Sequence, residues 1–245
     1  MWLFISISAY FINAGVYIAD KFLLSKKIHS SIAYAFYVGI WSIFNVVLLF
    51  FAKWWMPSLQ ELTLDLLAGF LFLVTLVFWY KALHQSEASR VVPVVGALVP
   101  IFSFILSFVF LDETLSKQQL LAFIILICGG VLISIKHTKV YLFKKLTNRI
   151  REVVGGIFGE VPAGAQPTSR ILVNSVVAAV FFACYYVLMK YIYMYQPFVG
   201  SFVWSRLGSF VGVILMLFVA DWRRVIVEQQ RGAKTPKNLF FFLTV

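Results

Sequence analysis

The stretch Val91–Leu111, VVPVVGALVPIFSFILSFVFL, contains no charged side chain. A helix needs about 20 apolar residues to cross the hydrocarbon layer of a bilayer, so this stretch is long enough to span a membrane. The whole chain agrees, because 62% of its 245 residues are hydrophobic, 13% are charged and the mean hydropathy is +0.91. Soluble domains have about 45–50% apolar and about 25% charged residues. The sequence therefore predicts an all-α integral membrane protein.

The same length criterion identifies further spans along the chain. Two of them, Leu66–Tyr80 and Leu120–Ile135, are short and are expected to include flanking residues. The first span ends in Asp20-Lys21 instead of a small-residue cleavage site, which favours a membrane helix over a signal peptide. The further spans are Trp2–Ala19, Ile32–Ala52, Leu66–Tyr80, Leu120–Ile135, Ile171–Met189 and Pro197–Ala220.

The sequence turns apolar once more from Asn238 and stops after a few residues. This final run is too short to cross a membrane. We therefore expect either a C-terminally incomplete chain or an incomplete last helix.

The formal net charge of +11 comes from basic residues placed between the apolar runs. Most of the 21 lysines and arginines follow the first, third, fifth and seventh spans. Because these residues are enriched in cytoplasmic loops, the charge pattern predicts that these loops are cytoplasmic and that the N-terminus is outside. Dispersed flanking cations favour a membrane protein over a nucleic-acid-binding one. Cys128 and Cys184 lie in apolar runs and predict neither a disulfide framework nor a metal cluster.

Residues 136–170 divide the chain into two parts, 1–135 and 171–245. Apolar residues recur at helical spacing in this segment while its cations point elsewhere, which is typical of a helix lying on an anionic membrane surface. Glycines and prolines later in the segment fit a solvated linker equally well. Both interpretations remain open.

A weak internal repeat relates the two parts. Shifting the sixth span back by 169 positions aligns five of its residues with the first span, and a shift of 163 places Trp204-Ser205 on Trp41-Ser42. A unit with five helices must begin its second copy from the opposite side of the membrane, as in the inverted repeats of secondary transporters. Chance similarity between apolar helices is the alternative. The first alignment sets Ser175, Ala178, Ala183, Tyr186 and Lys190 on Ser6, Ala9, Ala14, Tyr17 and Lys21.

A longer set of motifs lies between Tyr80 and Ser134. It comprises Lys81-Ala82-Leu83, Glu87-Ala88-Ser89, Val92-Pro93, Leu98-Val99-Pro100-Ile101-Phe102, Phe110-Leu111-Asp112-Glu113-Thr114-Leu115, Gln118 and Cys128-Gly129-Gly130-Val131-Leu132-Ile133. This pattern resembles the EamA-type repeat of the drug/metabolite transporter superfamily. The resemblance implies ten helices in two inverted five-helix repeats, with the second repeat truncated here after about two helices.

Three features depart from that family pattern. Asp112 stands where a glycine is usual, and Ile43 stands at the place that corresponds to Arg206 in the other repeat. Family members are generally drawn with a cytoplasmic N-terminus, whereas the charge pattern here predicts the opposite orientation.

The span Val91–Leu111 and its N-terminal flank carry small residues and prolines on one helical face. Each proline removes a backbone donor and leaves a carbonyl group free, which is tolerated at membrane depth only against protein or water. We interpret this face as a cavity wall and gating hinge, with close packing through small residues as the alternative. The face consists of Ser89, Pro93, Gly96, Pro100, Ser103 and Ser107, and we assign Pro93, Gly96 and Pro100 to the candidate substrate site.

Arg206 lies near the middle of its span, where a guanidinium costs at least about 2.5 kcal/mol on insertion scales. It should therefore face the interior of the bundle and bind either an anionic substrate or a structural partner. Small residues beside it predict close helix packing. They are Ser201, Ser205, Gly208 and Gly212.

Other polar and aromatic side chains complete the predicted substrate site, although aromatic belts at membrane interfaces use the same residue types. We expect Asp20, Lys21 and Lys190 to reach the interface, and Glu113 to orient the turn after its span. The predicted site residues are Asn13, Tyr17, Trp79, Tyr80, Tyr185 and Tyr186.

Catalysis is not predicted, because the histidines flank the spans and no motif for a nucleophile or paired metal ligands occurs. No Walker motif is present, so coupling would come from an ion gradient or from exchange. We predict a multi-pass cell-membrane transporter of a small solute. No cofactor and no nucleic acid partner are predicted, whereas a coupling ion and a homodimer are both compatible with the sequence. The alternatives are a lipid-linked head-group flippase and a membrane scaffold.

Overall fold

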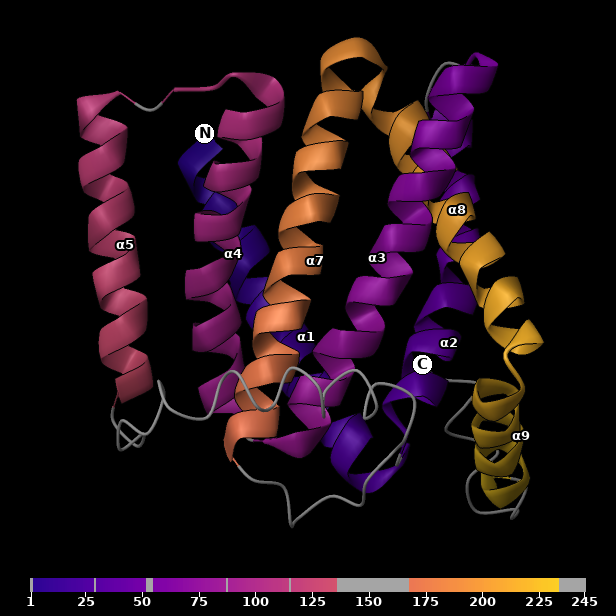
Figure 1. The fold of residues 1–245 in the computed structure, drawn as a ribbon. Coiled ribbons are helices and arrows are strands. Elements are labelled where there is room, and N and C mark those ends of the chain that lie inside the picture. The colour runs from indigo at the N-terminus through magenta and orange to yellow at the C-terminus, as the bar shows by residue number, and fades with distance from the viewer. Residues whose placement is uncertain are drawn as a thin grey trace.

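The computed structural model describes residues 2–28, 30–51, 55–86, 88–114, 116–135 and 168–233, and the regular elements in these ranges are helices (Figure 1). Six of these helices are long and apolar enough to cross a membrane. The predicted all-helical, multi-pass fold is therefore confirmed. The elements are α1 (Trp2–Lys26), α2 (Ser31–Trp41), the 3-10 helix η1 (Ser42–Phe51), α3 (Leu59–Gln85), α4 (Ala88–Leu111), α5 (Lys117–Ile135), α7 (Thr168–Tyr195), α8 (Phe198–Phe218) and α9 (Ala220–Ala233).

The helix predicted at Leu66–Tyr80 is longer at both ends than its apolar run. Its first turn is stabilised by a capping box, in which the Ser58 hydroxyl accepts from the Glu61 amide and the Glu61 carboxylate accepts from the Ser58 amide at 2.7 Å. The amphipathic segment 136–170 lies outside the described residues apart from the beginning of α7. The run from Asn238 also lies outside them.

The span predicted over Ile32–Ala52 is long and apolar enough to cross a membrane between Ser31 and Leu48, but it is not one regular α-helix. The α-helix ends at Trp41 and the chain continues as a 3-10 helix. At the change, the Ser42 hydroxyl donates to the carbonyl oxygen of Gly39 within the helix and lies 3.1 Å from the carbonyl oxygen of Arg206. Serine side chains that bond to backbone carbonyls compete with the helical pattern, which gives a physical reason for the change.

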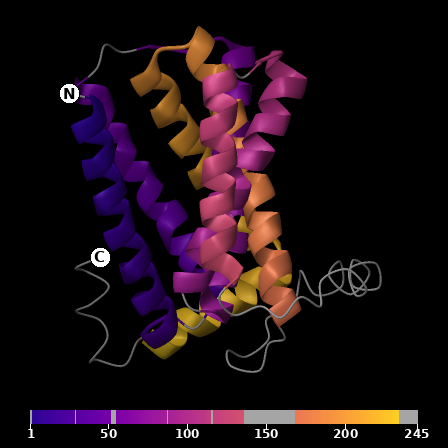
Figure 2. The ribbon, with the colours of Figure 1, turned by 90° about the vertical axis from the view of Figure 1, so that its left-hand side faces the viewer.

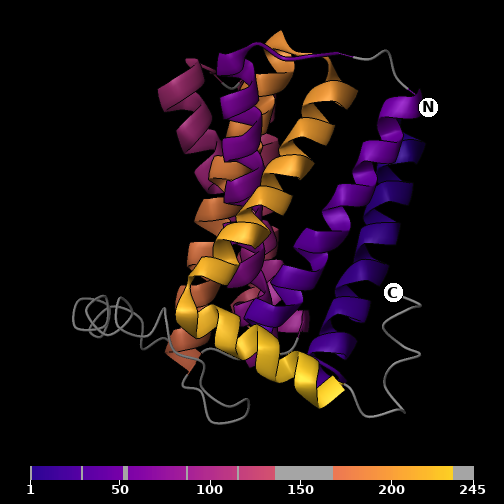
Figure 3. The same ribbon diagram turned by 90° about the vertical axis from the view of Figure 1, so that its right-hand side faces the viewer.

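Helix α9 was not predicted, because its charged sequence falls outside the apolar runs. Val219 has extended dihedral angles and separates α9 from α8. Figure 3 shows α9 crossing the lower end of the bundle from α8 toward α1. Its apolar side faces the protein, since Ile226 is buried, and the Gln229 side chain donates to the Lys27 carbonyl oxygen at 3.2 Å.

Helix α3 is the central element and packs against α7 and α8, whereas α5 packs against α4 at the edge of the bundle (Figures 1 and 2). At the crossing of α3 and α8 the two backbones meet through glycines. A β-carbon on Gly69 would overlap the carbonyl oxygen of Ser205, and one on Gly208 would overlap that of Leu66. The prediction of close packing through small residues in α8 is confirmed.

The directions of the helices alternate along the bundle. In Figure 1, α1 runs downward from the N-terminus, whereas α7 runs upward and α8 downward. The connections after α1, α3 and α8 therefore meet at the lower end, which carries the cations that predict a cytoplasmic side. Most of α1 is exposed; its lower end joins the core through Leu24, which is fully buried.

Candidate substrate-binding site

Arg206 is held among aromatic rings of α3, α7 and α8. Its guanidinium carbon lies 4.0 Å from the ring centroid of Phe72 on α3 and 4.8 Å from that of Phe202 on α8. The Tyr185 hydroxyl on α7 accepts a hydrogen bond from Arg206 Nη2 at 3.4 Å. Rings within about 6 Å of a guanidinium attract it through their electron-rich faces. Arg206 therefore faces protein from three helices, as predicted.

The guanidinium retains unused hydrogen-bonding capacity. It carries five N–H donors, and no acidic side chain pairs with it in the described ranges. The predicted structural pair with an acid is therefore not observed in this part of the chain, and the donors that remain suit an anionic ligand.

A continuous series of ring contacts, here called the aromatic chain, connects α1 to Arg206. Its centroid separations of 5.0–5.9 Å lie in the range preferred by aromatic pairs. At its α1 end, the Asn13 amide donates to the Tyr17 hydroxyl at 3.0 Å, and Tyr186 in its middle is half exposed. The structure thus brings together most of the predicted site residues. The members, in order, are Tyr17, Trp79, Phe182, Tyr186, Tyr185 and Phe72.

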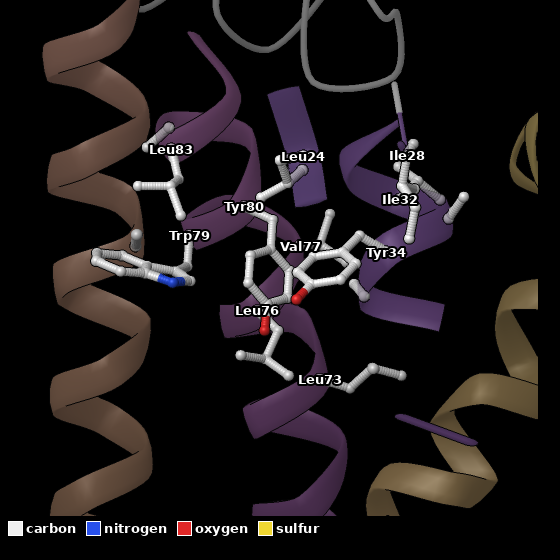
Figure 4. Close-up of a cluster of buried hydrophobic side chains, with 14 of the residues drawn as sticks. Leu24, Ile28, Ile32, Tyr34, Leu73, Leu76, Val77, Trp79, Tyr80 and Leu83 are labelled. Atoms are coloured by element: carbon white, nitrogen blue, oxygen red, sulfur yellow. The ribbon is translucent and has the colours of Figure 1, made fainter. Parts of the chain in front are cut away.

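Tyr80 points to a different neighbour. Its ring lies edge-on to Tyr34 with centroids 4.5 Å apart, and Figure 4 shows the two rings side by side between α3 and α2. The Tyr34 hydroxyl donates to Asp20 Oδ1 at 2.6 Å. Tyr80 therefore borders the aromatic chain through its neighbour Trp79 and forms part of a second, polar contact with α1.

The expectation that the first span ends at Asp20-Lys21 is wrong, and the expectation that these side chains reach the membrane interface stays a prediction. Helix α1 continues to Lys26, and the Asp20 side chain is only 7% exposed. Lys21 donates to the carbonyl oxygens of Leu83 and Ser86 at 2.7 and 2.6 Å. These carbonyls lie at the C-terminal end of α3, where a cation is favoured by the helix dipole. Both side chains join α1 to the bundle.

Lys190 and Glu113 form an ion pair between α7 and the turn after α4. Glu113 thus connects this turn to another helix, and the expectation that Lys190 reaches the interface stays a prediction. Below the pair lies an apolar pocket of about 320 Å³. It is lined by Leu64, Leu106, Phe110, Leu111, Cys184, Val187, Leu188 and Tyr191.

The α4 face that contains Pro93, Gly96 and Pro100 is not connected to the aromatic chain by the contacts of the described residues. Both prolines lie inside the continuous helix α4. A β-carbon on Gly96 would meet nothing within 4 Å, so close packing does not explain this glycine. The role of this face in substrate binding stays a prediction.

The model of the EamA-like transporter family matches residues 1–135, which contain α1 to α5. The chain belongs to the EamA-like transporter family. A 33% identical segment of 76 residues relates it to an uncharacterized protein of Methanocaldococcus jannaschii, covering 31% of this chain and 55% of the relative. The chain thus spans about half the length of that relative. No solved structure matches the chain significantly.

One EamA-like motif is explained by backbone geometry. Asp112 occupies the position where the EamA-type motif usually has glycine, and its φ of 52° lies in the left-handed region. Glycine adopts this region without steric cost, and aspartate tolerates it better than most residues.

The EamA-like family is a family of transporters and not of enzymes. No group of three or more potential metal ligands gathers in the ranges described.

Sequence reasoning missed several residues of the candidate site and its surroundings. Phe182 and Phe202 lie one helical turn before Tyr186 and Arg206, and this i, i+4 spacing could have identified them. A second buried carboxylate, Asp65, was also missed. With its amide nitrogen turned toward α3, Gln196 donates to the two Asp65 oxygens at 3.0 and 3.1 Å. No local pattern predicts such a contact between α3 and the α7–α8 turn.

Proposed function

We propose that this protein is a secondary transporter that carries a small solute with an anionic group and an apolar body across the membrane by alternating access. The observation that carries the proposal is Arg206, a guanidinium within a membrane-spanning helix that is surrounded by Phe72, Phe202 and Tyr185. Ionisable residues inside membranes mark substrate and ion pathways. A carboxylate or phosphate could use the remaining N–H donors of Arg206.

The aromatic chain supports the proposal that the solute has an apolar body. Aromatic rings offer apolar surface, and Tyr17, Tyr185 and Tyr186 add hydroxyl groups. Ligand sites commonly combine such apolar walls with a few polar groups that fix orientation. The chain of contacts extends from α1 to α8, so a solute bound along it would touch both parts of the sequence.

The opposite directions of α1 and α7 support an inverted repeat. Ser42 contacts the backbone of Arg206, and the repeat alignment pairs Ser42 with the preceding residue, Ser205. A crossing at equivalent positions is what a two-fold relation between α2 and α8 requires. Inverted repeats place the substrate between the two copies near the middle of the membrane.

The test is uptake into liposomes that contain the purified chain. The solutes are benzoate, benzyl alcohol and benzylamine, which share a ring and differ in charge. We expect benzoate to be taken up preferentially, Arg206→Gln to abolish this uptake, and Arg223→Gln on the exposed side of α9 to preserve it. Equal uptake by both variants would contradict the assignment of Arg206. No flux of any solute from folded protein would favour a scaffold.

The apolar pocket below the Lys190–Glu113 pair favours one alternative function, movement of a lipid-linked head group. An amphipathic lipid could place its chain in the pocket and its head group beside the ion pair. Translocation of a fluorescent phospholipid in the same liposomes distinguishes this function. It predicts lipid movement that Leu188→Trp, which fills the pocket, abolishes while benzoate uptake is unaffected.

A further inference from the structure

The Asp20 side chain is a buried carboxyl group within a membrane-spanning helix. It is 7% exposed, and its neighbours Leu24, Tyr34 and Tyr80 are at most 6% exposed. In the described ranges its hydrogen-bond donor is the Tyr34 hydroxyl, at 2.6 Å. A charged carboxylate at membrane depth is costly, and such residues mark proton relays and ion pathways. Asp20 therefore calls for an explanation beyond helix packing.

The partner of Asp20 can respond to a proton. A tyrosine hydroxyl both donates and accepts hydrogen bonds, so Tyr34 can donate to the carboxylate and accept from the carboxylic acid. Asp65 faces the Gln196 side chain, whose amide offers a nitrogen donor in one orientation and an oxygen acceptor in the other, so Asp65 is a necessary control in the test below. Of these two buried carboxyl groups, Asp20 is the one on α1, the helix that carries Tyr17 of the aromatic chain.

Asp20 also lies near the α1 end of the aromatic chain. Tyr34 touches Tyr80, which is adjacent in sequence to Trp79, and Trp79 touches Tyr17 with ring centroids 5.3 Å apart. Tyr17 lies one helical turn before Asp20 on α1. The Asp20–Tyr34 bond therefore lies beside the α1 end of the aromatic chain.

We propose that Asp20 is a proton-binding site that couples solute movement to a proton gradient. The carboxylate takes up one proton from water on one side and releases the same proton to the other, and no other bond is made or broken. The coupling rests on the proposed transport function, whereas proton binding itself does not.

Other ionisable groups lie near Asp20 on α1 and α3. Lys21 on α1 binds the end of α3, Tyr17 and Tyr80 line the same region, and Lys81 and His84 lie at the end of α3. Helices α4 and α9 contribute apolar side chains to this cluster, including Val91, Val95 and Ile226. Histidine side chains change charge near neutral pH, so His84 needs its own control.

The test is infrared difference spectroscopy of the full chain in lipid nanodiscs, recorded between mildly alkaline and mildly acidic pH. Protonation of a carboxylate produces a carboxylic acid carbonyl band. We expect the wild-type chain to show such a band, Asp20→Asn to lose it, and Tyr34→Phe to shift it because the hydrogen bond is removed. Three control variants, Asp65→Asn, Asp112→Asn and His84→Gln, should retain it, and exchanging sodium for potassium should not change it.

A band that persists in Asp20→Asn, or that is lost only in Asp65→Asn, would overturn the proposal, as would a wild-type chain without any band. A sodium-dependent band would overturn it in favour of a metal cation. If Asp20→Asn does not fold, an unshifted band in Tyr34→Phe would be the overturning result. Solute flux is measured separately, so the two proposals can fail independently. A missing band with intact benzoate uptake would contradict only the proton site. A band that behaves as expected without benzoate uptake would contradict only the transport function.

Discussion

The hydroxyl of Ser209 donates a 2.8 Å hydrogen bond to the carbonyl oxygen of Gly69, where α8 crosses α3. The bond is buried, and Gly69 and Gly208 allow the two backbones to approach closely enough to form it. In membranes, helices associate through such close packing and interhelical hydrogen bonds, because lipid provides little hydrophobic driving force. This crossing fixes the position of Arg206 relative to Phe72.

We expect Gly69→Ala to destabilise the fold by at least about 1–3 kcal/mol, the usual cost of overpacking, because the new methyl group would overlap the Ser205 carbonyl oxygen. Thermal unfolding in detergent measures the effect. Gly15→Ala is the matched control, since a β-carbon there meets nothing within 4 Å. Equal unfolding temperatures for the two variants would contradict the observed crossing.

Arg206→Lys tests the ring contacts separately from the charge. Lysine keeps the positive charge but lacks the planar group that lies over Phe72. A cation–π contact contributes about 0.5–2 kcal/mol, so we expect benzoate affinity to fall by about 2- to 30-fold without complete loss. Concentration-dependent uptake measures the change. Phe72→Leu should give a similar loss, and an unchanged affinity in both variants would argue against a role of the ring.

Lys21→Met should destabilise the protein because it removes two charge-assisted hydrogen bonds to the end of α3. Each hydrogen bond to a charged group contributes about 1.5–3 kcal/mol, so a loss of at least this size is expected when both are removed. Lys26→Met is the control, because Lys26 is at the end of α1 and its contact is the Phe22 ring. Chemical unfolding of both variants decides the point, and equal stability would show that the carbonyl contacts contribute little.

Ile226→Asn should release α9 from the lower end of the bundle, because it places an amide in a buried apolar position. The expected result is faster proteolytic cleavage within α9. Arg224→Ala on the exposed side of the same helix should have little effect, since its i, i+4 pair with Glu228 is worth about 0.3–0.5 kcal/mol. Similar cleavage rates for the two variants would mean that α9 is not held by Ile226.

The membrane spans could be predicted from the sequence because each depends on local composition. Arg206 and the tyrosines of α7 could be predicted for a related reason, since a polar group inside an apolar run is unusual wherever it lies. The glycine contacts of α8 also followed from spacing along one helix. In each case the relevant physical property is contained in a few consecutive residues.

The remaining features depend on contacts between distant segments. Asp20 was placed at the interface because the apolar run ends beside it, and its burial becomes evident only when α2 and α3 are in position. Helix α9 was missed because an amphipathic helix on a bundle has too few apolar residues to resemble a span. The contact between Asp65 and Gln196 joins elements far apart in sequence, which no periodicity reveals.

The 3-10 helix η1 gives the second span an unusual mechanical property. A 3-10 helix rises about 2.0 Å per residue with about 3.0 residues per turn, whereas an α-helix rises about 1.5 Å with about 3.6 residues per turn. Rewinding the 10 residues of η1 into an α-helix would therefore shorten the segment by about 5 Å and rotate its far end by roughly half a revolution. Ser42, at the start of η1, contacts the backbone of Arg206. A change in the helical pitch of η1 would therefore change the length of the span that contacts the backbone of Arg206.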